Sequence, residues 1–234
     1  MTAQGTLYGV GVGPGDPQLL TLKACEVIAK ADVLAYPVDG SGKSRARATA
    51  SAVIPQGANE LPIHVPIKIE RGPACDAYDE AARGISEHLG AGRDVAYLCV
   101  GDPLFYGSFI YLAARLGEAH EIEVVPGVTS LSVCAARTLA PLAGRNDIFS
   151  IVPAPLPEDA LKSALAGADA AAIIKLGRHF NKVRDVLRAL GLVERTIVLQ
   201  SVTGEDERVI ALEDAAEDDA PYFSTILVRR GELT

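Results

Sequence analysis

The sequence contains no tryptophan, and aromatic residues make up only 5% of its 234 residues. Proteins that bind single-stranded nucleic acid stack bases on aromatic side chains, so this composition disfavours such a platform. An excess of basic residues is also missing, because 22 Lys and Arg stand against 30 Asp and Glu, a formal net charge of −8. Nucleic-acid binding needs a basic surface, so we expect no nucleic-acid partner.

Long uncharged apolar runs are missing too, although 49% of the residues are hydrophobic. A membrane span needs about 18 or more such residues, so we expect no membrane-spanning segment and no membrane partner. The chain enters a predicted strand directly after Gly5, without the basic and apolar segments of a signal peptide. The cysteines form no CxxC pair, which predicts reduced, mostly core thiols of a cytoplasmic protein, with no disulfide and no metal site. They are Cys25, Cys75, Cys99 and Cys134.

The most informative stretch is an apolar run, residues 95–100, that breaks abruptly into Gly101-Asp-Pro103. Six consecutive apolar or small residues predict a strand buried on both faces, as in a parallel sheet. Gly-Asp-Pro is typical of a turn, and ligands of open α/β sheets bind outside the carboxyl ends of the strands. The same tripeptide recurs as Gly15-Asp-Pro17 after a predicted strand at residues 7–12. We therefore expect both turns to line one ligand site.

Strands alternate with helices along the chain, which predicts an α/β fold with mostly parallel sheets and right-handed crossovers. A helix is expected over residues 19–31, with Thr21 as a plausible N-cap. We place a domain change near residues 117–121, giving domains 1–118 and 119–234. The further predicted strands cover residues 32–37, 121–125, 148–152, 170–176, 196–200 and 222–229.

The first glycine loop does not match two well-known nucleotide-binding patterns. Both Gly9-x-Gly11-x-x-Pro14 and Gly11-x-Gly13-x-x-Asp16 lack the Gly or Ala that a dinucleotide fingerprint has at its sixth position. The loop also lacks the Lys-Ser/Thr ending of a P-loop, and an aspartate there would repel phosphate. A tight turn that binds no ligand is the plain alternative.

Three motifs taken together are more specific: Gly11-Val-Gly-Pro-Gly-Asp-Pro17, Gly101-Asp-Pro-Leu-Phe-Tyr-Gly-Ser108 and Val125-Pro-Gly-Val-Thr-Ser130. In this order they resemble the tetrapyrrole methylases of cobalamin and sirohaem synthesis. Further stretches resemble the precorrin-2 C20-methyltransferase branch of that family, at residues 107–112, 140–147, 175–183 and 220–225. The resemblance spans nearly the whole chain.

The resemblance implies two α/β domains with a cleft between them that binds S-adenosylmethionine. It also implies a homodimer and a tetrapyrrole substrate, precorrin-2, which is methylated at carbon 20 to give precorrin-3A. Near the end of the chain, Gln200-Ser-Val-Thr203 departs from the Glu-Arg-Ala-Thr-like run that relatives have there. The resemblance to the family implies that ten residues contact the methyl donor. They are Pro14, Val100, Gly101, Asp102, Phe105, Thr129, Ser130, Leu176, Val202 and Thr225.

Asp102 is the carboxylate of the strongest motif. Our hypothesis is that it accepts hydrogen bonds from polar groups of the donor and favours the donor's positive charge. The alternative is that it only caps the following helix.

An octacarboxylate substrate requires local cations in so acidic a chain, and arginine suits bidentate carboxylate recognition. Two basic clusters qualify, each with a solvated helix face as the alternative. The first cluster is Lys43, Arg45 and Arg47, and the second is Lys175, Arg178 and His179 with Lys182.

Carbon 20 must lose a proton after methylation, but no pattern identifies a base. His64, Tyr106 and His179 are conceivable, and the macrocycle's nitrogens or water are the alternative. Three other functions stay open: methylation at another carbon, a cobalt-precorrin-2 substrate, and a binding module without catalysis.

Overall fold

The computed structural model describes residues 4–65, 71–204, 206–216, 220–221 and 223–231. The chain forms two compact α/β units, Met1–Thr129 and Ser130–Thr234, which confirms the expected fold class. The division comes later than the expected boundary after residue 118. The reason is that strand β5 (Ile122–Val125) pairs with β1 (Leu7–Gly11) and so belongs to the first unit.

The first unit is built on a five-stranded sheet with the strand order β3-β2-β4-β1-β5. Each neighbouring pair is parallel, as expected, so all five carboxyl ends lie at one edge. Strand β3 was not predicted, because it contains Pro62 and stands at the sheet edge, where proline is tolerated. The remaining strands of this sheet are β2 (Val33–Val38), β3 (Glu60–His64) and β4 (Val95–Cys99).

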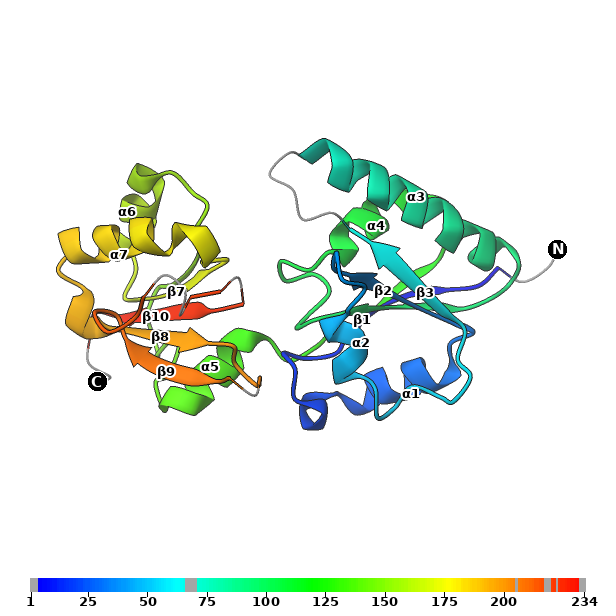
Figure 1. Ribbon diagram of the computed structural model, residues 1–234, viewed down its shortest axis with the longest axis horizontal. Coiled ribbons are helices and arrows are strands. Elements are labelled where there is room, and N and C mark those ends of the chain that lie inside the picture. Colours follow the sequence, from blue (N-terminus) through cyan, green and yellow to red (C-terminus); the bar gives the residue numbers. More distant parts are fainter. Residues whose placement is uncertain (1–3, 66–70, 205, 217–219, 222, 232–234) are drawn as a thin grey trace. The chain divides into compact units, whose positions relative to one another are not determined.

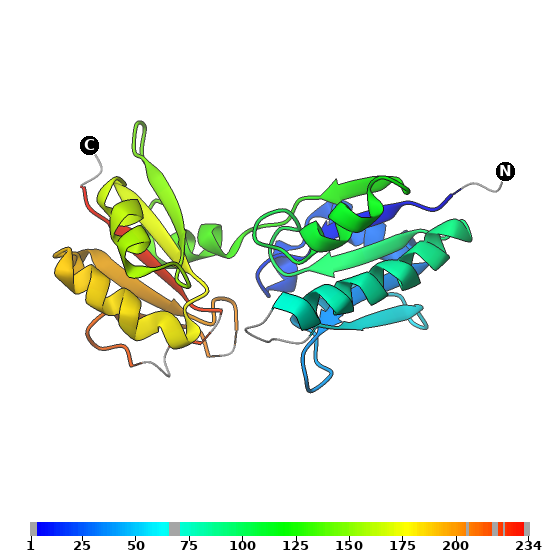
Figure 2. The same ribbon diagram turned by 90° about the horizontal axis from the view of Figure 1, so that it is seen from above.

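Helices cover both faces of this sheet, as Figures 1 and 2 show. Tyr97 and Cys99 of β4 belong to the core under α3 and α4, whereas Ala96 and Leu98 belong to the core under α1 and α2. Strand β4 is therefore buried on both faces, which is why its sequence is continuously apolar. The helices are α1 (Leu22–Lys30), α2 (Arg45–Thr49), α3 (Arg71–Gly90) and α4 (Phe109–Leu116).

Helix α1 begins at Leu22, and its predicted cap is confirmed. The Thr21 hydroxyl accepts a hydrogen bond from the Ala24 backbone N–H at 3.1 Å. The helix begins later than expected because Pro17–Leu19 form a separate 3-10 turn. The Asp16 carboxylate starts that turn by accepting from the Gln18 N–H at 2.9 Å.

The second unit contains a mixed sheet with the strand order β6-β7-β10-β8-β9. Only β6 and β7 are parallel, so the expectation of a mostly parallel sheet is wrong here. Residues 201–207, which join β8 to β9, are too few for a parallel crossover, which needs about a dozen or more. Tyr222, expected at the start of the last strand, lies outside the described residues. The strands are β6 (Phe149–Pro153), β7 (Ala170–Ile174), β8 (Thr196–Gln200), β9 (Arg208–Ala211) and β10 (Thr225–Arg229).

Helices α6 (Glu158–Ala166) and α7 (Phe180–Ala189) pack on one face of this sheet, while α5 (Ser130–Thr138) lies against β10 on the other side (Figure 1). The core under α6 and α7 includes Ile173 and Ile226. Among the described residues, no helix combines the length and the apolar character that crossing a bilayer requires.

Candidate functional site

Two of the three motif loops are hydrogen-bonded to each other at the carboxyl edge of the first sheet. The Gly101 N–H donates to the Gly13 carbonyl at 2.7 Å, and the Gly13 N–H donates to the Gly101 carbonyl at 3.3 Å. Strand β1 lies between β4 and β5, so the third loop, after β5, also starts beside the first. The loops that contain the two Gly-Asp-Pro turns therefore lie side by side, while their lining of one ligand site stays a prediction.

Because glycine has no side chain, the three motif loops pack backbone against backbone. A Cβ on Gly127 would lie 2.1 Å from the Gly101 carbonyl oxygen and 2.8 Å from the Gly11 Cα. A Cβ on Gly11 would lie 2.6 Å from the Gly127 Cα. Only glycine fits at either position without movement of the main chain. We name this contact of Gly11, Gly13, Gly101 and Gly127 the glycine junction.

Gly101 differs from the other glycines of the junction, because open space adjoins it. It has a φ of +72°, and no described atom lies within 4 Å of the position that a Cβ would take. Gly101 itself is buried, so this open space adjoins an enclosed part of the main chain. Two expected donor contacts are close in sequence or in space: Val100 precedes it, and Pro14 follows its partner Gly13. This arrangement fits a donor held mainly by backbone groups.

The Asp102 carboxylate joins the second loop to the third. Its Oδ1 accepts from the Leu104 N–H at 2.9 Å, and its Oδ2 accepts from the Gly127 N–H at 3.0 Å. The N-cap position of α4 is Ser108, so Asp102 does not cap this helix and that alternative is wrong. Sequence reasoning missed Gly127 as its partner, although a glycine in a motif loop was the available clue.

The rest of the second motif places an aromatic pair at this edge. Phe105, an expected donor contact, is half-buried and stacks edge-to-face on Tyr106, with ring centroids 5.2 Å apart. Tyr106 has a φ of 56°, a left-handed conformation that strains a non-glycine residue. Tyr106 is 44% exposed and Leu104 is 58% exposed. Strain of this kind concentrates at functional sites.

Thr129 and Ser130 follow the third loop, and both are half-buried. Thr129 is the last residue of the first unit, and Ser130 is the first residue of α5. The rigidity of the Gly127 main chain therefore bears directly on where these two expected donor contacts lie.

The expected donor contacts of the second unit follow or begin neighbouring strands. Leu176 follows β7, Val202 follows β8, and Thr225 starts β10, which lies between those strands in the opposite direction. All three residues are buried within this unit, main chain included. Left-handed φ values recur beside them, at Lys175 (60°) and Ser201 (47°).

In the first basic cluster, Arg47 is committed to a carboxylate. Its Nε and Nη2 donate to the two oxygens of Glu60 at 2.7 and 2.8 Å, and the Tyr36 hydroxyl also donates to Glu60. Hydrogen bonds from Arg47 and Tyr36 lower the pKa of Glu60 to about 2. Arg45 instead donates to the Pro14 carbonyl at 3.2 Å, and burial lowers its pKa. Lys43 is exposed.

In the second basic cluster, Arg178 is exposed, whereas Lys175 and His179 are half-buried. Burial lowers the pKa of His179, and the positive charges of Lys182 and Arg178 lower it further. Lys182 donates to the Leu156 carbonyl. The 3-10 turn Gly177–His179 therefore presents an exposed cation beside an imidazole that is mainly neutral at pH 7.

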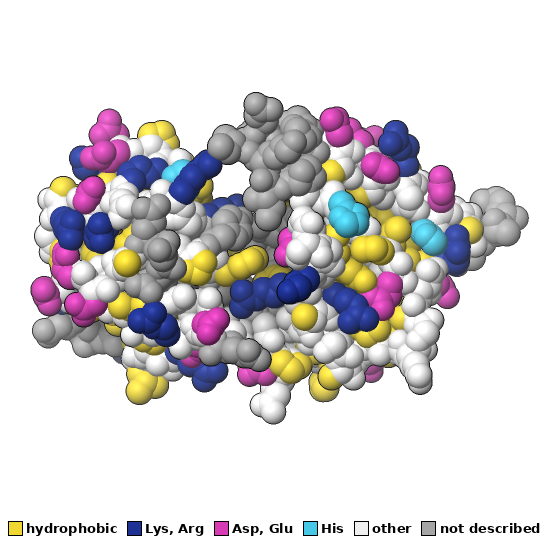
Figure 3. Space-filling model, viewed as in Figure 1, with side chains coloured by type: hydrophobic (Ala, Val, Ile, Leu, Met, Phe, Trp, Pro, Cys, Tyr) yellow, Lys and Arg dark blue, Asp and Glu magenta, His cyan; other side chains and the backbone are white. Residues whose placement is uncertain are grey.

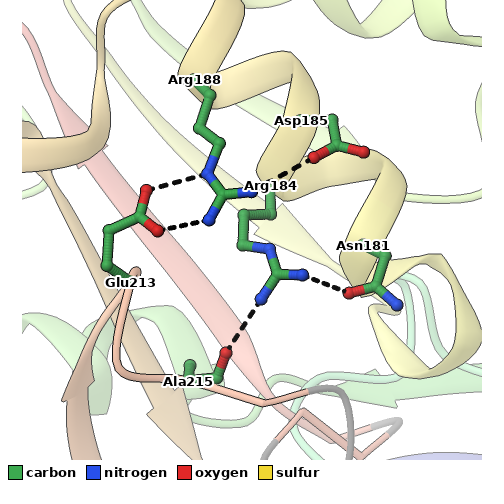
Figure 4. A network of polar contacts seen from close by, with 6 residues as sticks. All are labelled: Asn181, Arg184, Asp185, Arg188, Glu213 and Ala215. Atoms are coloured by element: carbon green, nitrogen blue, oxygen red, sulfur yellow. Dashed lines mark hydrogen bonds and ion pairs between the residues drawn. The ribbon is translucent and has the colours of Figure 1, made fainter.

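Two other cations of α7 are engaged in structural contacts, as Figure 4 shows. Arg184 donates to Asn181 Oδ1 at 2.8 Å and to the Ala215 carbonyl at 3.2 Å. Arg188 binds Glu213 through two nitrogens and lies near Asp185. These contacts tie α7 to the segment after β9.

Three further features concern metal binding, surface charge and the candidate base His64. Among the described residues, no group of three or more His, Cys, Asp or Glu side chains could hold a metal ion. On the face shown in Figure 3, Lys and Arg side chains are interspersed with Asp and Glu side chains. His64, a conceivable base, is exposed at the end of β3.

Comparison with known proteins identifies the family. Residues 6–216 match the family model of the tetrapyrrole (corrin/porphyrin) methylases. The precorrin-2 C(20)-methyltransferase of Sinorhizobium sp is 38% identical over 96% of this chain and 95% of that protein. The cobalt-precorrin-2 C(20)-methyltransferase of Salmonella typhimurium is 28% identical over 97% of each chain.

A solved structure is similar over nearly the full length as well. The uroporphyrin-III C-methyltransferase of Thermus thermophilus, in complex with S-adenosyl homocysteine, has a TM-score of 0.67 and 28% identity. The match covers 96% of this chain and 97% of that chain. The order of the three motifs, the glycine junction that they form and these similarities lead to one conclusion. The chain belongs to the tetrapyrrole methylase family.

Proposed function

We propose that this protein transfers a methyl group from S-adenosylmethionine to carbon 20 of precorrin-2, giving precorrin-3A in cobalamin biosynthesis. The observation that carries the proposal is the 38% identity to a precorrin-2 C(20)-methyltransferase over 96% of the chain. The fold agrees with it, because the motif loops meet at a sheet edge where α/β proteins bind ligands.

The proposed donor site uses main-chain groups more than side chains. The open space beside Gly101 favours contact through backbone amides and carbonyls there. Leu176, Val202 and Thr225 are proposed as further contacts, because each follows or begins one of three neighbouring strands of the second sheet. The proposed set also contains Val100, the main chain of Asp102, Phe105, Thr129 and Ser130.

The bound donor supplies an electrophilic methyl group on a sulfonium, and its leaving group is a neutral thioether that needs no acid. The protein's main task is then orientation, because an in-line displacement requires the nucleophilic carbon on the methyl–sulfur axis. Correct placement of two reactants is worth effective molarities on the order of 10⁵ M or more. A junction of tightly packed backbone provides such placement better than mobile side chains do.

We propose that both basic clusters bind carboxylates of the substrate, but they differ in which cations are already engaged by the protein. In the second, Arg178 is exposed on a short turn with His179 beside it, and Lys175 precedes that turn. In the first, Arg47 already binds Glu60, so Lys43 and Arg45 are the better candidates. Because Arg45 also contacts the Pro14 carbonyl, a carboxylate there would lie close to the first motif loop.

No side chain is assigned as the base that removes the proton from carbon 20. His64 and Tyr106 are exposed, and His179 is half-buried. We propose that a macrocycle nitrogen or water accepts this proton. A normal rate and a flat pH–rate profile for each single variant would support this view.

Three finer points extend the proposal. The substrate is metal-free precorrin-2 rather than its cobalt complex. The reason is that sequence identity is 38% to the relative named for precorrin-2 and 28% to the relative named for cobalt-precorrin-2. The protein forms a homodimer, as its resemblance to the family implies. The protein acts in the cytoplasm, in keeping with its free cysteines.

Incubation with precorrin-2 and a ¹³C-methyl donor tests the reaction. We expect a mass gain of one methyl group and a new ¹³C resonance for a methyl on carbon 20. A resonance from another ring carbon would point to a different tetrapyrrole methylase. Donor binding without any mass gain would support a binding module, and a faster reaction with cobalt-precorrin-2 would reassign the substrate.

A further inference from the structure

The chain contains the tripeptide Gly-Asp-Pro twice, and the two aspartates make different contacts. In both, Oδ1 accepts a hydrogen bond from the N–H two residues later: Gln18 for Asp16 and Leu104 for Asp102, each at 2.9 Å. Asp102 makes an additional bond, because its Oδ2 accepts from the Gly127 N–H at 3.0 Å. The shared bond shapes a local turn, so the additional bond must serve another purpose.

The additional bond joins loops whose strands do not touch. β4 and β5 lie on opposite sides of β1, so no sheet hydrogen bond holds the loop after β4 to the loop after β5. Asp102 reaches across the end of β1, where Gly11 has no side chain to block the approach. The Gly127 backbone in turn lies against the Gly101 carbonyl so closely that a Cβ would be 2.1 Å from it.

This bond controls the main chain just ahead of two proposed donor contacts. Gly127 precedes Thr129 by two residues and Ser130 by three, and the glycine itself adds backbone freedom. A charged acceptor makes a stronger hydrogen bond than a neutral one. The carboxylate therefore removes freedom from the third loop before any ligand arrives.

We infer that the Asp102 side chain has a positioning role: its carboxylate acts on the donor site by holding Gly127 rather than by binding the donor. The hydrogen bond itself is a property of the folded chain. Only the consequence for methyl transfer rests on the proposed function. Each level can be tested separately.

Hydrogen exchange of backbone amides in the donor-free protein tests whether Asp102 holds Gly127. We expect Asp102→Ala to accelerate exchange of the Gly127 N–H by roughly 10- to 100-fold, the loss of one charge-assisted hydrogen bond. Asp16→Ala is the matched control, because it removes the same local turn without a bond between loops. Asp16→Ala should accelerate hydrogen exchange of the Gln18 N–H and leave the exchange rate of the Gly127 N–H unchanged. Unaltered Gly127 exchange in Asp102→Ala would overturn the inference, even if the protein proved to have another activity.

Steady-state kinetics tests the consequence for the site. A misplaced third loop should lower kcat at saturating donor by at least about tenfold, because orientation fails even when the donor is bound. A raised donor KM with normal kcat would instead show a direct contact and overturn the inference. Asp102→Asn keeps one acceptor oxygen and should fall between wild type and Asp102→Ala in both measurements. If Asp102→Ala does not fold, the Asn variant decides, with wild-type Gly127 exchange and kcat as the overturning result.

Discussion

Glu60 holds Arg47 through both of its carboxylate oxygens, at 2.7 and 2.8 Å from the guanidinium nitrogens. The pair ties α2 to the edge strand β3, and the Tyr36 hydroxyl of β2 joins it. An arginine that looks like a substrate ligand in the sequence is therefore already part of the first unit's framework.

This pair makes the stability of the protein depend on pH. The pKa of Glu60 falls from 4.5 to about 2 on folding. The Glu60 carboxylate therefore adds to the free energy of unfolding above pH 4.5, and this stabilisation is lost as the pH falls towards 2. We expect Glu60→Gln to lower the free energy of unfolding at pH 7 by about 1 kcal/mol, since both side chains are partly exposed. Urea unfolding at several pH values should show the two proteins converging between pH 4.5 and 2. A difference that stays constant down to pH 2 would contradict this assignment.

A methyl group on Gly11 should disrupt the glycine junction. Its Cβ would lie 2.6 Å from the Gly127 main chain and 2.7 Å from the Gly101 carbonyl oxygen, so backbone must move. We expect Gly11→Ala to cost about 1–3 kcal/mol of stability and to weaken donor binding, measured by thermal unfolding and calorimetry. Gly84→Ala is the control, since no described atom within 4 Å opposes a Cβ there within α3. That change should stabilise the protein by up to about 1 kcal/mol, and wild-type behaviour of Gly11→Ala would argue against a rigid junction.

The four thiols should react with iodoacetamide in the order of their exposure. Burial raises the pKa of Cys99 to about 12 and that of Cys134 to about 11, so neither forms appreciable thiolate at pH 8. Cys75 is exposed and should be modified first, as mass spectrometry of peptides can show. Cys99 lies in the first unit and Cys134 in the second, so their slow labelling reports the opening of each unit. All four should react in urea, and rapid labelling of Cys99 in the native protein would contradict the fold around β4.

Charge reversal at Arg178 tests the second basic cluster. We expect Arg178→Glu to raise KM for precorrin-2 by at least about tenfold, because a carboxylate would lose a cation and meet a like charge. Donor affinity by calorimetry should stay at the wild-type value. Arg188→Gln is the control, because Arg188 lies in the following helix, α7, and already binds Glu213 and Asp185. If KM for precorrin-2 does not change in Arg178→Glu, the cluster plays no part in substrate binding.

Local features of the fold were predictable from short stretches of sequence. The apolar run of β4, the cap at Thr21 and the Gly-Asp-Pro turns each depend on residues only a few positions apart. Burial on both faces imposes a continuous apolar pattern, and a cap needs one hydroxyl near one N–H. For this reason the α/β class could be predicted without a structure.

Elements that depend on a partner were missed or only partly predicted. Strands β3 and β9 carry weak patterns of their own and exist because β2 and β8 pair with them. The reversed direction of β10 likewise follows from its neighbours in the second sheet. Edge strands are stabilised by hydrogen bonds to another strand, which a local pattern does not record.

The sequence by itself determined the three motif loops, their order and the family resemblance that they carry. Only the tertiary structure decided which polar groups were already engaged, such as Arg47 with Glu60 and Asp102 with Gly127. The physical reason is that a hydrogen bond depends on distance and direction in space, and 25 residues separate Asp102 from its partner. A carboxylate that could have served as a donor ligand is, in the folded chain, what joins two of the loops.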